Sequence, residues 1–125
     1  MKIFLISPVR NITEDEKEKI FNYVKTLERG GNIVHWPFRD INQNDIIGNR
    51  ILDDNCIAMI NSDEIHIWWN EKSQGSVFDL GMAWILEKYT KRKIIIANAE
   101  EIIPTTTKSF NNVVLSIHQQ NQLKK

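Results

Sequence analysis

The sequence predicts an α/β protein built on a doubly wound parallel sheet, flavodoxin-like or Rossmann-like, with strand order 2-1-3-4. Two observations lead to this fold class. Short runs of apolar, β-branched residues alternate with longer segments in which apolar residues recur at helical spacing, and the connections between them are short. At 125 residues, the chain is expected to form one domain over residues 1–125.

Residues 2–7, KIFLIS, form a continuous apolar run, which is typical of a strand buried on both faces of a parallel sheet. A helix is expected over residues 13–31. Thr13 and Glu16 have the spacing of a capping box at its start, and Gly30 ends it. One face of this helix is expected to be apolar: Ile20, Tyr23, Val24 and Leu27.

Residues 32–36, NIVHW, predict a second strand, and the polar segment 37–45 predicts a long loop. A second helix is expected over residues 46–62, where Gly48 weakens the first turn. Cys56 is interpreted as a small buried hydrophobic residue rather than a nucleophile. The apolar side of this helix is expected to consist of Ile51, Leu52, Cys56, Met59 and Ile60.

Residues 64–69, EIHIWW, alternate in polarity and are rich in β-branched and aromatic types, which predicts a third strand. A third helix over residues 76–89 and a fourth strand over residues 93–98 follow. Residues 110–117 fit either a short fifth strand or a helix. The tail from about residue 118 is expected to fray.

The expected topology indicates where a ligand would bind. In a doubly wound sheet, the ligand crevice opens where the winding direction reverses, beyond the carboxyl ends of strands one and three. Those ends carry residues 7–11, SPVRN, and residues 70–76, NEKSQGS. Arg10 is either an anion clamp or an ordinary solvated arginine. Trp69, near the end of the third strand, is expected to reach the crevice.

The start of the third helix has two interpretations. Ser73, Gly75 and Ser76 lie at the beginning of a helix whose first N–H groups lack partners, which favours an anion such as phosphate. Ser76 and Asp79 also have the spacing of a capping box, so Asp79 is either a cap or a functional carboxylate. Gly81, inside the helix, is expected to pack closely against a strand or a ligand.

The charge balance excludes some classes of partner. The 16 basic and 16 acidic residues form no basic block except the terminal Lys124 and Lys125, so neither a nucleic acid polymer nor an anionic membrane is indicated. The apolar run at residues 2–7 is far shorter than a membrane span of roughly 20 residues, and a cytoplasmic location is expected. No histidine has a second histidine or cysteine at ligand spacing, so no metal or other cofactor is expected.

Three segments, KIFLISPVR, NSDEIHIW and SQGSVFDLGMAW, resemble the nucleoside 2-deoxyribosyltransferase superfamily, which includes 2'-deoxynucleoside 5'-phosphate N-hydrolases. The resemblance spans roughly residues 2–97. It implies a carboxylate at the head of the third helix that attacks the anomeric carbon of deoxyribose and releases the base. The matching residue is Asp79. The resemblance also implies a nucleoside or nucleotide as partner, no cofactor, and a homo-oligomer.

The chain departs from the superfamily pattern at three positions. Asp79 stands where the superfamily has a glutamate. Asn55, next to Asp54, stands where an aspartate assists the leaving base, and Ile3 stands where the nucleotide hydrolases have a tyrosine. Asn55 can hydrogen-bond a base but cannot transfer a proton, and Asn55 with Asp54 is expected to orient the leaving base.

The positions that contact phosphate in the superfamily are better retained. Ser7 and Ser73 match serines of the pattern, and Arg10 matches an arginine with an offset of one residue. The loop after the second strand would then face the base or the sugar, unless it is an ordinary solvated connection. Its candidate residues are Arg39, Asp40, Asn42 and Asp45.

Three functional hypotheses follow. The first is an enzyme that cleaves or exchanges the N-glycosidic bond of a nucleoside or its 5'-monophosphate. The second is a nucleotide-binding sensor or sequestering protein that has lost turnover. The third is an interaction domain of the same fold class whose exposed aromatic side chains form a partner surface.

Overall fold

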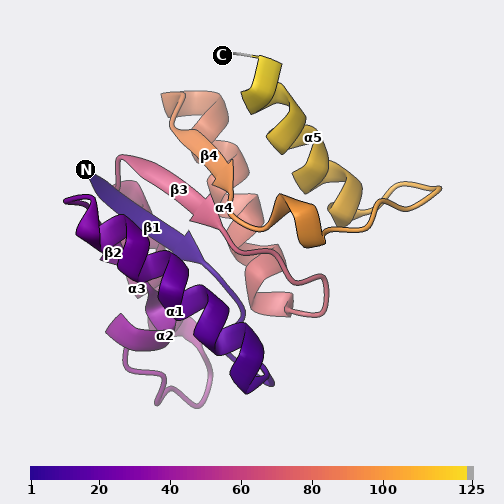
Figure 1. Ribbon diagram of the computed structural model, residues 1–125. Coiled ribbons are helices and arrows are strands. Elements are labelled where there is room, and N and C mark those ends of the chain that lie inside the picture. The colour runs from indigo at the N-terminus through magenta and orange to yellow at the C-terminus, as the bar shows by residue number, and fades with distance from the viewer. Residues whose placement is uncertain (124–125) are drawn as a thin grey trace.

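The computed structural model describes residues 1–123 and shows a parallel four-stranded sheet flanked by helices (Figure 1). The strands lie in the order β2-β1-β3-β4, and every pairing is parallel, so the predicted fold class and strand order are confirmed. The strands are β1 (Lys2–Ile6), β2 (Ile33–His35), β3 (Glu64–Ile67) and β4 (Lys93–Ile96). The helices are α1 (Glu14–Arg29), α2 (Pro37–Asp40), α3 (Asn49–Ile60), α4 (Gln74–Thr90) and α5 (Phe110–Leu123), with a 3-10 turn η1 (Ala99–Glu101).

The segment that fitted either a fifth strand or a helix is helical. Val114 and Ile117 are buried at helical spacing in α5, and both belong to the apolar cluster that contains the β4 residues Ile94 and Ile96. The alternative of a fifth strand is therefore wrong. Residues 118–123 continue α5, and the remainder of the tail expected to fray lies outside the described residues.

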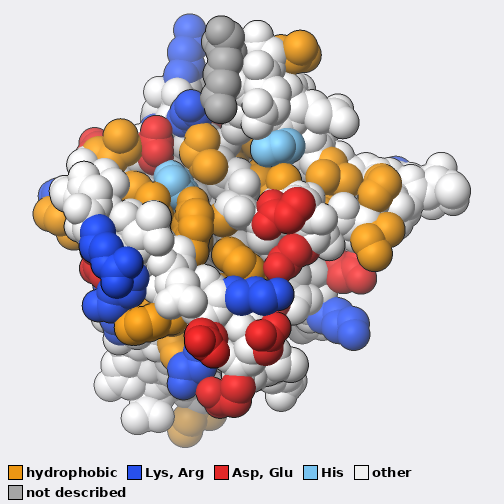
Figure 2. Space-filling view, in the orientation of Figure 1, with side chains coloured by type: hydrophobic (Ala, Val, Ile, Leu, Met, Phe, Trp, Pro, Cys, Tyr) orange, Lys and Arg blue, Asp and Glu red, His pale blue; other side chains and the backbone are white. Residues whose placement is uncertain are grey.

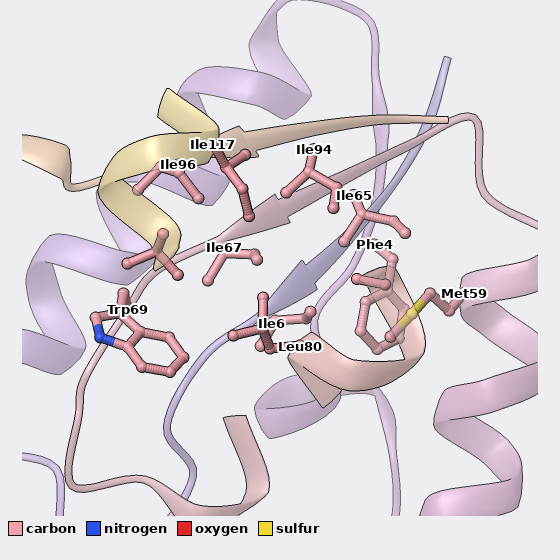
Figure 3. Close-up of a cluster of buried hydrophobic side chains, with 12 residues drawn as sticks. Phe4, Ile6, Met59, Ile65, Ile67, Trp69, Leu80, Ile94, Ile96 and Ile117 are labelled. Carbon is pink, nitrogen blue, oxygen red and sulfur yellow. The ribbon is translucent and has the colours of Figure 1, made fainter. Parts of the chain in front are cut away.

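Both faces of the sheet are buried because the strand residues alternate between two apolar clusters. Phe4 and Ile6 point into the cluster formed with α3, α4 and α5, where Met59 and Leu80 also lie (Figure 3). Ile3 and Leu5 point into the second cluster, against α1. The alternation continues past the end of β3: Trp69 lies in the first cluster and Trp68 in the second.

The starts of three helices can be compared with the residues that were expected to favour or weaken them. Thr13 caps α1 as predicted, because its side chain accepts a hydrogen bond from the N–H of Glu16 at 3.1 Å. Gly48 precedes α3 with a φ of 100°, a left-handed conformation that favours glycine, so it sets the start of the helix rather than weakening its first turn. The predicted loop 37–45 contains the short α2, where Pro37 occupies the first turn.

The apolar side of α3 differs from the prediction. Met59 is buried, but Ile60 is largely exposed, and Leu52 and Cys56 are only partly covered. Asn55 is buried instead, because it occupies the side of α3 that faces the sheet, one turn before Met59.

Asn98 holds the carboxyl ends of β3 and β4 together beyond the last strand pairing. Its Oδ1 accepts a hydrogen bond from the N–H of Trp69 at 2.8 Å, and its Nδ2 donates to the carbonyl of Trp69 at 2.9 Å. The side chain is almost completely buried, so it replaces a backbone partner that Trp69 would otherwise lack. Asn98 therefore fixes the chain where it leaves β3 for the loop before α4.

Replacing Asn98 with alanine is expected to lower the free energy of unfolding by about 2–4 kcal/mol, because it leaves a buried N–H and a buried carbonyl without partners. Urea denaturation followed by circular dichroism measures this loss. Asn22→Ala, on the exposed surface of α1, is the matched control and should change stability by less than about 0.5 kcal/mol. Equal effects of the two substitutions would contradict the assigned role of Asn98.

Candidate functional site

The candidate site lies at the carboxyl edge of the sheet, where the winding direction reverses. β1 pairs with β2 on one side and with β3 on the other, so the segments after β1 and β3 leave from neighbouring positions. Ser7 and Arg10 follow β1, and Ser73 precedes α4 after β3. Because α3 and α4 each return the chain to the start of the next parallel strand, their N-termini lie at this same edge.

The position at which α4 begins rules out a capping role for Asp79. Ser73 is the N-cap, and its Oγ accepts a hydrogen bond from the N–H of Ser76 at 3.2 Å. The helix begins at Gln74, before the predicted start at residue 76, so Asp79 is the sixth helical residue and lies beyond reach of the free N–H groups. The prediction that Ser76 and Asp79 form a capping box is therefore wrong.

Asp79 is a buried carboxyl group without a partner. Its side chain is only 7% exposed, and its Oδ1 is enclosed and has no hydrogen bond. Burial disfavours the charged form and raises the pKa of Asp79 to about 7. Buried carboxylates in a stable core are normally paired or hydrogen-bonded, whereas an unpaired one with a shifted pKa is typical of a functional site.

Two further buried polar atoms without partners lie on the helices of the same sheet face. Ser76, one turn before Asp79 on α4, has an enclosed Oγ with no hydrogen bond, and Asn55 on α3 has an enclosed Oδ1 with none. Asn55 is the seventh residue of α3 and Asp79 the sixth of α4, so each lies about 10 Å below the start of its helix. Asn55 and Asp79, two of the three predicted catalytic residues, therefore lie at a similar depth from the starts of their helices.

A cavity of about 440 Å³ opens on the other flank of α3, next to the end of β2. His35 contributes an enclosed Nε2 that has no hydrogen bond, and its ring stacks on Phe4 with centroids 5.5 Å apart. Burial lowers the pKa of His35, so the imidazole is neutral at pH 7. The lining residues are His35, Asp40, Ile41, Asn42, Arg50, Asp54, Ile57 and Ala58.

The cavity joins three of the predicted site residues: Asp40, Asn42 and Asp54. Asp54 is not a free acid, since its Oδ2 accepts a hydrogen bond from Nη1 of Arg50 at 2.8 Å. Neither Asp79 nor Ser7 nor Ser73 lines this cavity. Helix α3 separates the cavity from Asp79. Its Asp54 borders the cavity, whereas the adjacent Asn55 points to the sheet.

Other residues predicted in the loop after β2 have local roles. The Oδ2 of Asp45 accepts hydrogen bonds from the N–H groups of Arg50 and Ile51, and the N–H of Gly48 is the largest contributor to the lowered pKa of Asp45. Asp45 is thus the cap of α3. Arg39 donates to Asp40 at 2.8 Å and pairs with Glu28 at 3.2 Å, so its guanidinium holds α2 against α1. The prediction that Arg39 and Asp45 face a ligand gains no support from these contacts.

The remaining predicted residues divide into two groups. Ser7 is buried, and its Oγ accepts a hydrogen bond from Nε1 of Trp36 at 3.0 Å; Arg10 is exposed, and Gly75 lies in the open first turn of α4. These stay near the edge where a ligand was expected. Trp69 does not reach a crevice: it is buried, and its Nε1 donates to Oδ1 of Asn111 on α5 at 2.7 Å.

Sequence reasoning missed the two polar residues that shape the cavity. Arg50 stands four residues before Asp54, the helical spacing of an ion pair, which would have indicated that this carboxylate is neutralised. His35 ends the second strand at the carboxyl edge, a position that favours contact with a ligand, whereas in the sequence the histidines were tested only as metal ligands. Among residues 1–123, no three His, Cys, Asp or Glu side chains are grouped closely enough to hold a metal ion.

The fold is similar to that of a solved enzyme. A 2-deoxyribosyltransferase from the psychrotolerant bacterium Bacillus psychrosaccharolyticus superposes with a TM-score of 0.60 at 16% sequence identity, over 90% of this chain and 90% of that chain. At this identity the likeness shows a shared fold. The sequence matches no known family model and no curated protein significantly. Across residues 1–123, no helix has the length and apolar character needed to cross a bilayer.

The buried carboxyl of Asp79 predicts a specific pH dependence of stability. In the unfolded chain the carboxyl ionises near pH 3.8, whereas in the folded chain it ionises near 7. Between these values the folded state binds the extra proton, so the free energy of unfolding falls as pH rises. Asp79→Asn removes this effect and is expected to be more stabilising at pH 8 than at pH 5, by about 2–3 kcal/mol.

Urea denaturation of the wild type and Asp79→Asn at the two pH values measures the difference. Asp15→Asn, an exposed carboxylate on α1 that pairs with Lys19 at 3.5 Å, is the matched control. Its effect on stability should be small at both pH values because exposed ion pairs contribute little. A stability difference between Asp79→Asn and the wild type that is the same at pH 5 and pH 8 would show that the carboxyl is not desolvated.

Proposed function

We propose that the protein cleaves or exchanges the N-glycosidic bond of a nucleoside or nucleoside 5'-monophosphate, with Asp79 as the nucleophile. The observation that carries this proposal is the buried, unpartnered Oδ1 of Asp79 on the first turns of α4. The fold shared with a 2-deoxyribosyltransferase also supports the proposal. A carboxylate with few hydrogen bonds is a stronger nucleophile than a solvated one, since no donor must be displaced before it attacks.

The reaction proceeds in two steps. An ionised oxygen of Asp79 bonds to the anomeric carbon of the sugar while the bond from that carbon to the base nitrogen breaks, and the electron pair leaves with the base. The base nitrogen then takes a proton from water or another donor. In the second step, water or a second base attacks the same carbon and releases the carboxylate. Asn55 and Ser76 would hydrogen-bond the base and the sugar hydroxyls near the reacting carbon.

The cavity beside α3 suits the base rather than a phosphate. Its two lining carboxylates are paired, Asp40 with Arg39 and Asp54 with Arg50, so neither guanidinium is free to bind an anion. His35, neutral in the cavity, offers one nitrogen that donates or accepts a hydrogen bond according to its tautomer. A phosphate would instead lie near Ser7, Arg10 and the N-terminus of α4, where Gly75 leaves the backbone accessible.

A second candidate is a nucleotide-binding protein that has lost turnover. The specific observation in its favour is the lack of a free acid beside the cavity: Asp54 is bonded to Arg50 at 2.8 Å, and Asn55 cannot transfer a proton. Such a protein would retain the nucleotide without cleaving it. The cytoplasmic location and the homo-oligomer expected from the sequence remain predictions, and they apply to either candidate function.

The first test is incubation of the purified protein with 2'-deoxynucleosides, their 5'-monophosphates and the ribose equivalents, followed by chromatography for free base. Asp79→Ala is expected to reduce base release by roughly 1,000-fold or more, because it removes the nucleophile. Because attack needs the ionised carboxylate, kcat/KM should rise with pH up to about 7 and level off above it. Asp15→Ala is the matched control and should keep full activity.

The outcomes separate the candidates. Base released by wild type and by Asp15→Ala, but not by Asp79→Ala, supports the glycosidic reaction. A nucleotide that co-elutes unchanged with the protein, with no base released from any substrate, favours the binding protein. Base release that survives in Asp79→Ala would exclude this residue as the nucleophile.

The assignment of the base to the cavity has its own test. His35→Ala is expected to weaken kcat/KM about 10-fold, mainly through KM, because it removes one hydrogen bond to a group that is bound before and during the reaction. If turnover is absent, the same substitution should weaken the Kd of the retained nucleotide by a similar factor. His118→Ala on α5 is the control, and an equal effect of both substitutions would contradict the assignment.

A further inference from the structure

Three polar side chains form a line of hydrogen bonds between α1 and β3, on the face of the sheet opposite α4. The Oη of Tyr23 on α1 lies 2.5 Å from Nδ1 of His66 on β3, and Nε2 of His66 lies 3.0 Å from Oε1 of Glu64. His66 is buried, and the ring of Tyr23 also packs edge-on against Trp68, with centroids 6.1 Å apart. The proposed function uses none of these side chains.

The two partners of His66 determine where its hydrogen lies. A carboxylate only accepts hydrogen bonds, so Nε2 of His66 carries a hydrogen and donates it to Glu64. In a neutral imidazole the other nitrogen, Nδ1, is then an acceptor, and the phenol of Tyr23 donates to it. Neutral His66 therefore satisfies both partners at once.

The ionisable groups around His66 come from three elements. Burial, the largest influence, lowers the pKa of His66, the hydrogen-bonded carboxylate of Glu64 on β3 raises it, and the ammonium group of Lys93 on β4 lowers it. From α1, Tyr23 contributes an uncharged phenol, because burial raises the pKa of Tyr23 to about 12. His66 is therefore neutral at pH 7 and gains a proton only in acid.

A proton taken up from solvent at Nδ1 disrupts this arrangement. Both nitrogens of an imidazolium are donors, so the phenol of Tyr23 has to turn its own hydrogen away from His66. The phenol has no other hydrogen-bond partner in the part of the chain that the structure describes. The residues paired with His66 in the sheet, Leu5 and Ile95, offer only apolar side chains. Protonation therefore costs the bond that joins α1 to β3.

Helix α1 has few other contacts on the side where this bond lies. Within residues 1–123, α3, α4 and α5 pack in the first apolar cluster, whereas α1 is the one long helix that packs in the second. Figure 1 accordingly shows α1 in front of the sheet beside an uncovered β4. In the space-filling view of the same face, charged side chains of both signs lie over α1 (Figure 2). Polar contacts, rather than a neighbouring helix, hold this flank of α1.

These contacts come from one stripe of α1. Glu16, Lys19 and Tyr23 are spaced three and four residues apart, which places them on the same side of the helix. Lys19 pairs with Glu101 of η1 at 3.4 Å, and Glu16 accepts a hydrogen bond from Nδ2 of Asn70 at 3.3 Å. The ion pair is exposed and the amide contact is long, so both are weak. The contact of Tyr23 with β3 is the strongest of the three because its partner is buried.

We propose that His66 is an acid-sensitive latch: its neutral imidazole holds the middle of α1 against β3 through Tyr23, and protonation at Nδ1 releases this contact and loosens α1. The latch acts through the packing of α1 on the sheet. It does not depend on the reaction assigned to Asp79.

Proton NMR titration of the histidines in the intact protein tests the direction of each hydrogen bond. Tyr23→Phe removes the donor to neutral Nδ1, so it is expected to raise the proton affinity of His66 by roughly 3- to 10-fold. Glu64→Gln removes the charge that favours the imidazolium and is expected to lower this affinity by a similar factor. His66→Gln identifies the resonance, and His118 on α5 is the internal control that should titrate unchanged.

Hydrogen exchange measures the release of α1. After correction for the intrinsic effect of pH, the amides of residues 20–27 are expected to lose roughly 5- to 10-fold of their protection, relative to the amides of α5, between pH 7 and pH 5. The comparison with α5 removes the effect of Asp79 on the stability of the whole fold. In Tyr23→Phe, which keeps the ring against Trp68, this relative protection should be low already at pH 7 and change less than about twofold.

Three results would overturn the latch. The first is a His66 that stays neutral down to pH 4.5 in the wild type. The second is a shift of the titration in the same direction by Tyr23→Phe and Glu64→Gln, or by neither. The third is a relative protection of α1 that is independent of pH in the wild type or equally dependent on pH in Tyr23→Phe. None of these readouts involves base release, so failure of this inference is distinguishable from failure of the proposed function.

Discussion

The parallel pairing of β1 with both β2 and β3 is the constraint on which the rest of the arrangement depends. Because the chain moves outward from β1 to β2 and then crosses back to β3, α1 covers one face of the sheet, and α3 and α4 cover the other. Both of the latter helices start at the carboxyl edge. The crossing thus brings the helices of Asn55 and Asp79 to the same face of the sheet, although the residues are distant in the chain.

The sequence was sufficient for the strands and their order, because continuous apolar runs separated by amphipathic helices permit few topologies. It was not sufficient for the start of α4. Ser73 and Ser76 are equally good N-caps by local chemistry, and the choice between them is made by tertiary packing, which buries Ser76 against the sheet layer. Likewise, Trp69 was expected at the crevice because the cover that α5 provides could not be predicted while residues 110–117 fitted either a strand or a helix.

Two carboxylates near the candidate site are hydrogen-bonded, whereas the enclosed oxygen of Asp79 is not. Asp45 accepts two backbone N–H groups at the start of α3, and Asp40 accepts the N–H of Trp36 and a bond from Arg39, so this edge of the sheet provides donors where a carboxylate is structural. Asp79 has none at its enclosed oxygen. A buried charge without donors lowers stability, and natural folds tolerate such a local conflict mainly where a group must react or bind.

The position of Asp79 also connects the site to the outer surface of α4. Phe78 and Asp79 are neighbours in the chain, yet Phe78 is exposed on the outward side of α4 and Asp79 is buried toward the sheet. A helix apolar on both sides has no clear solvent face, which is why its sequence shows little amphipathic contrast. Phe78 and Asp79 share one turn of α4, so the backbone that presents an exposed aromatic ring to the outside also positions the buried carboxyl group.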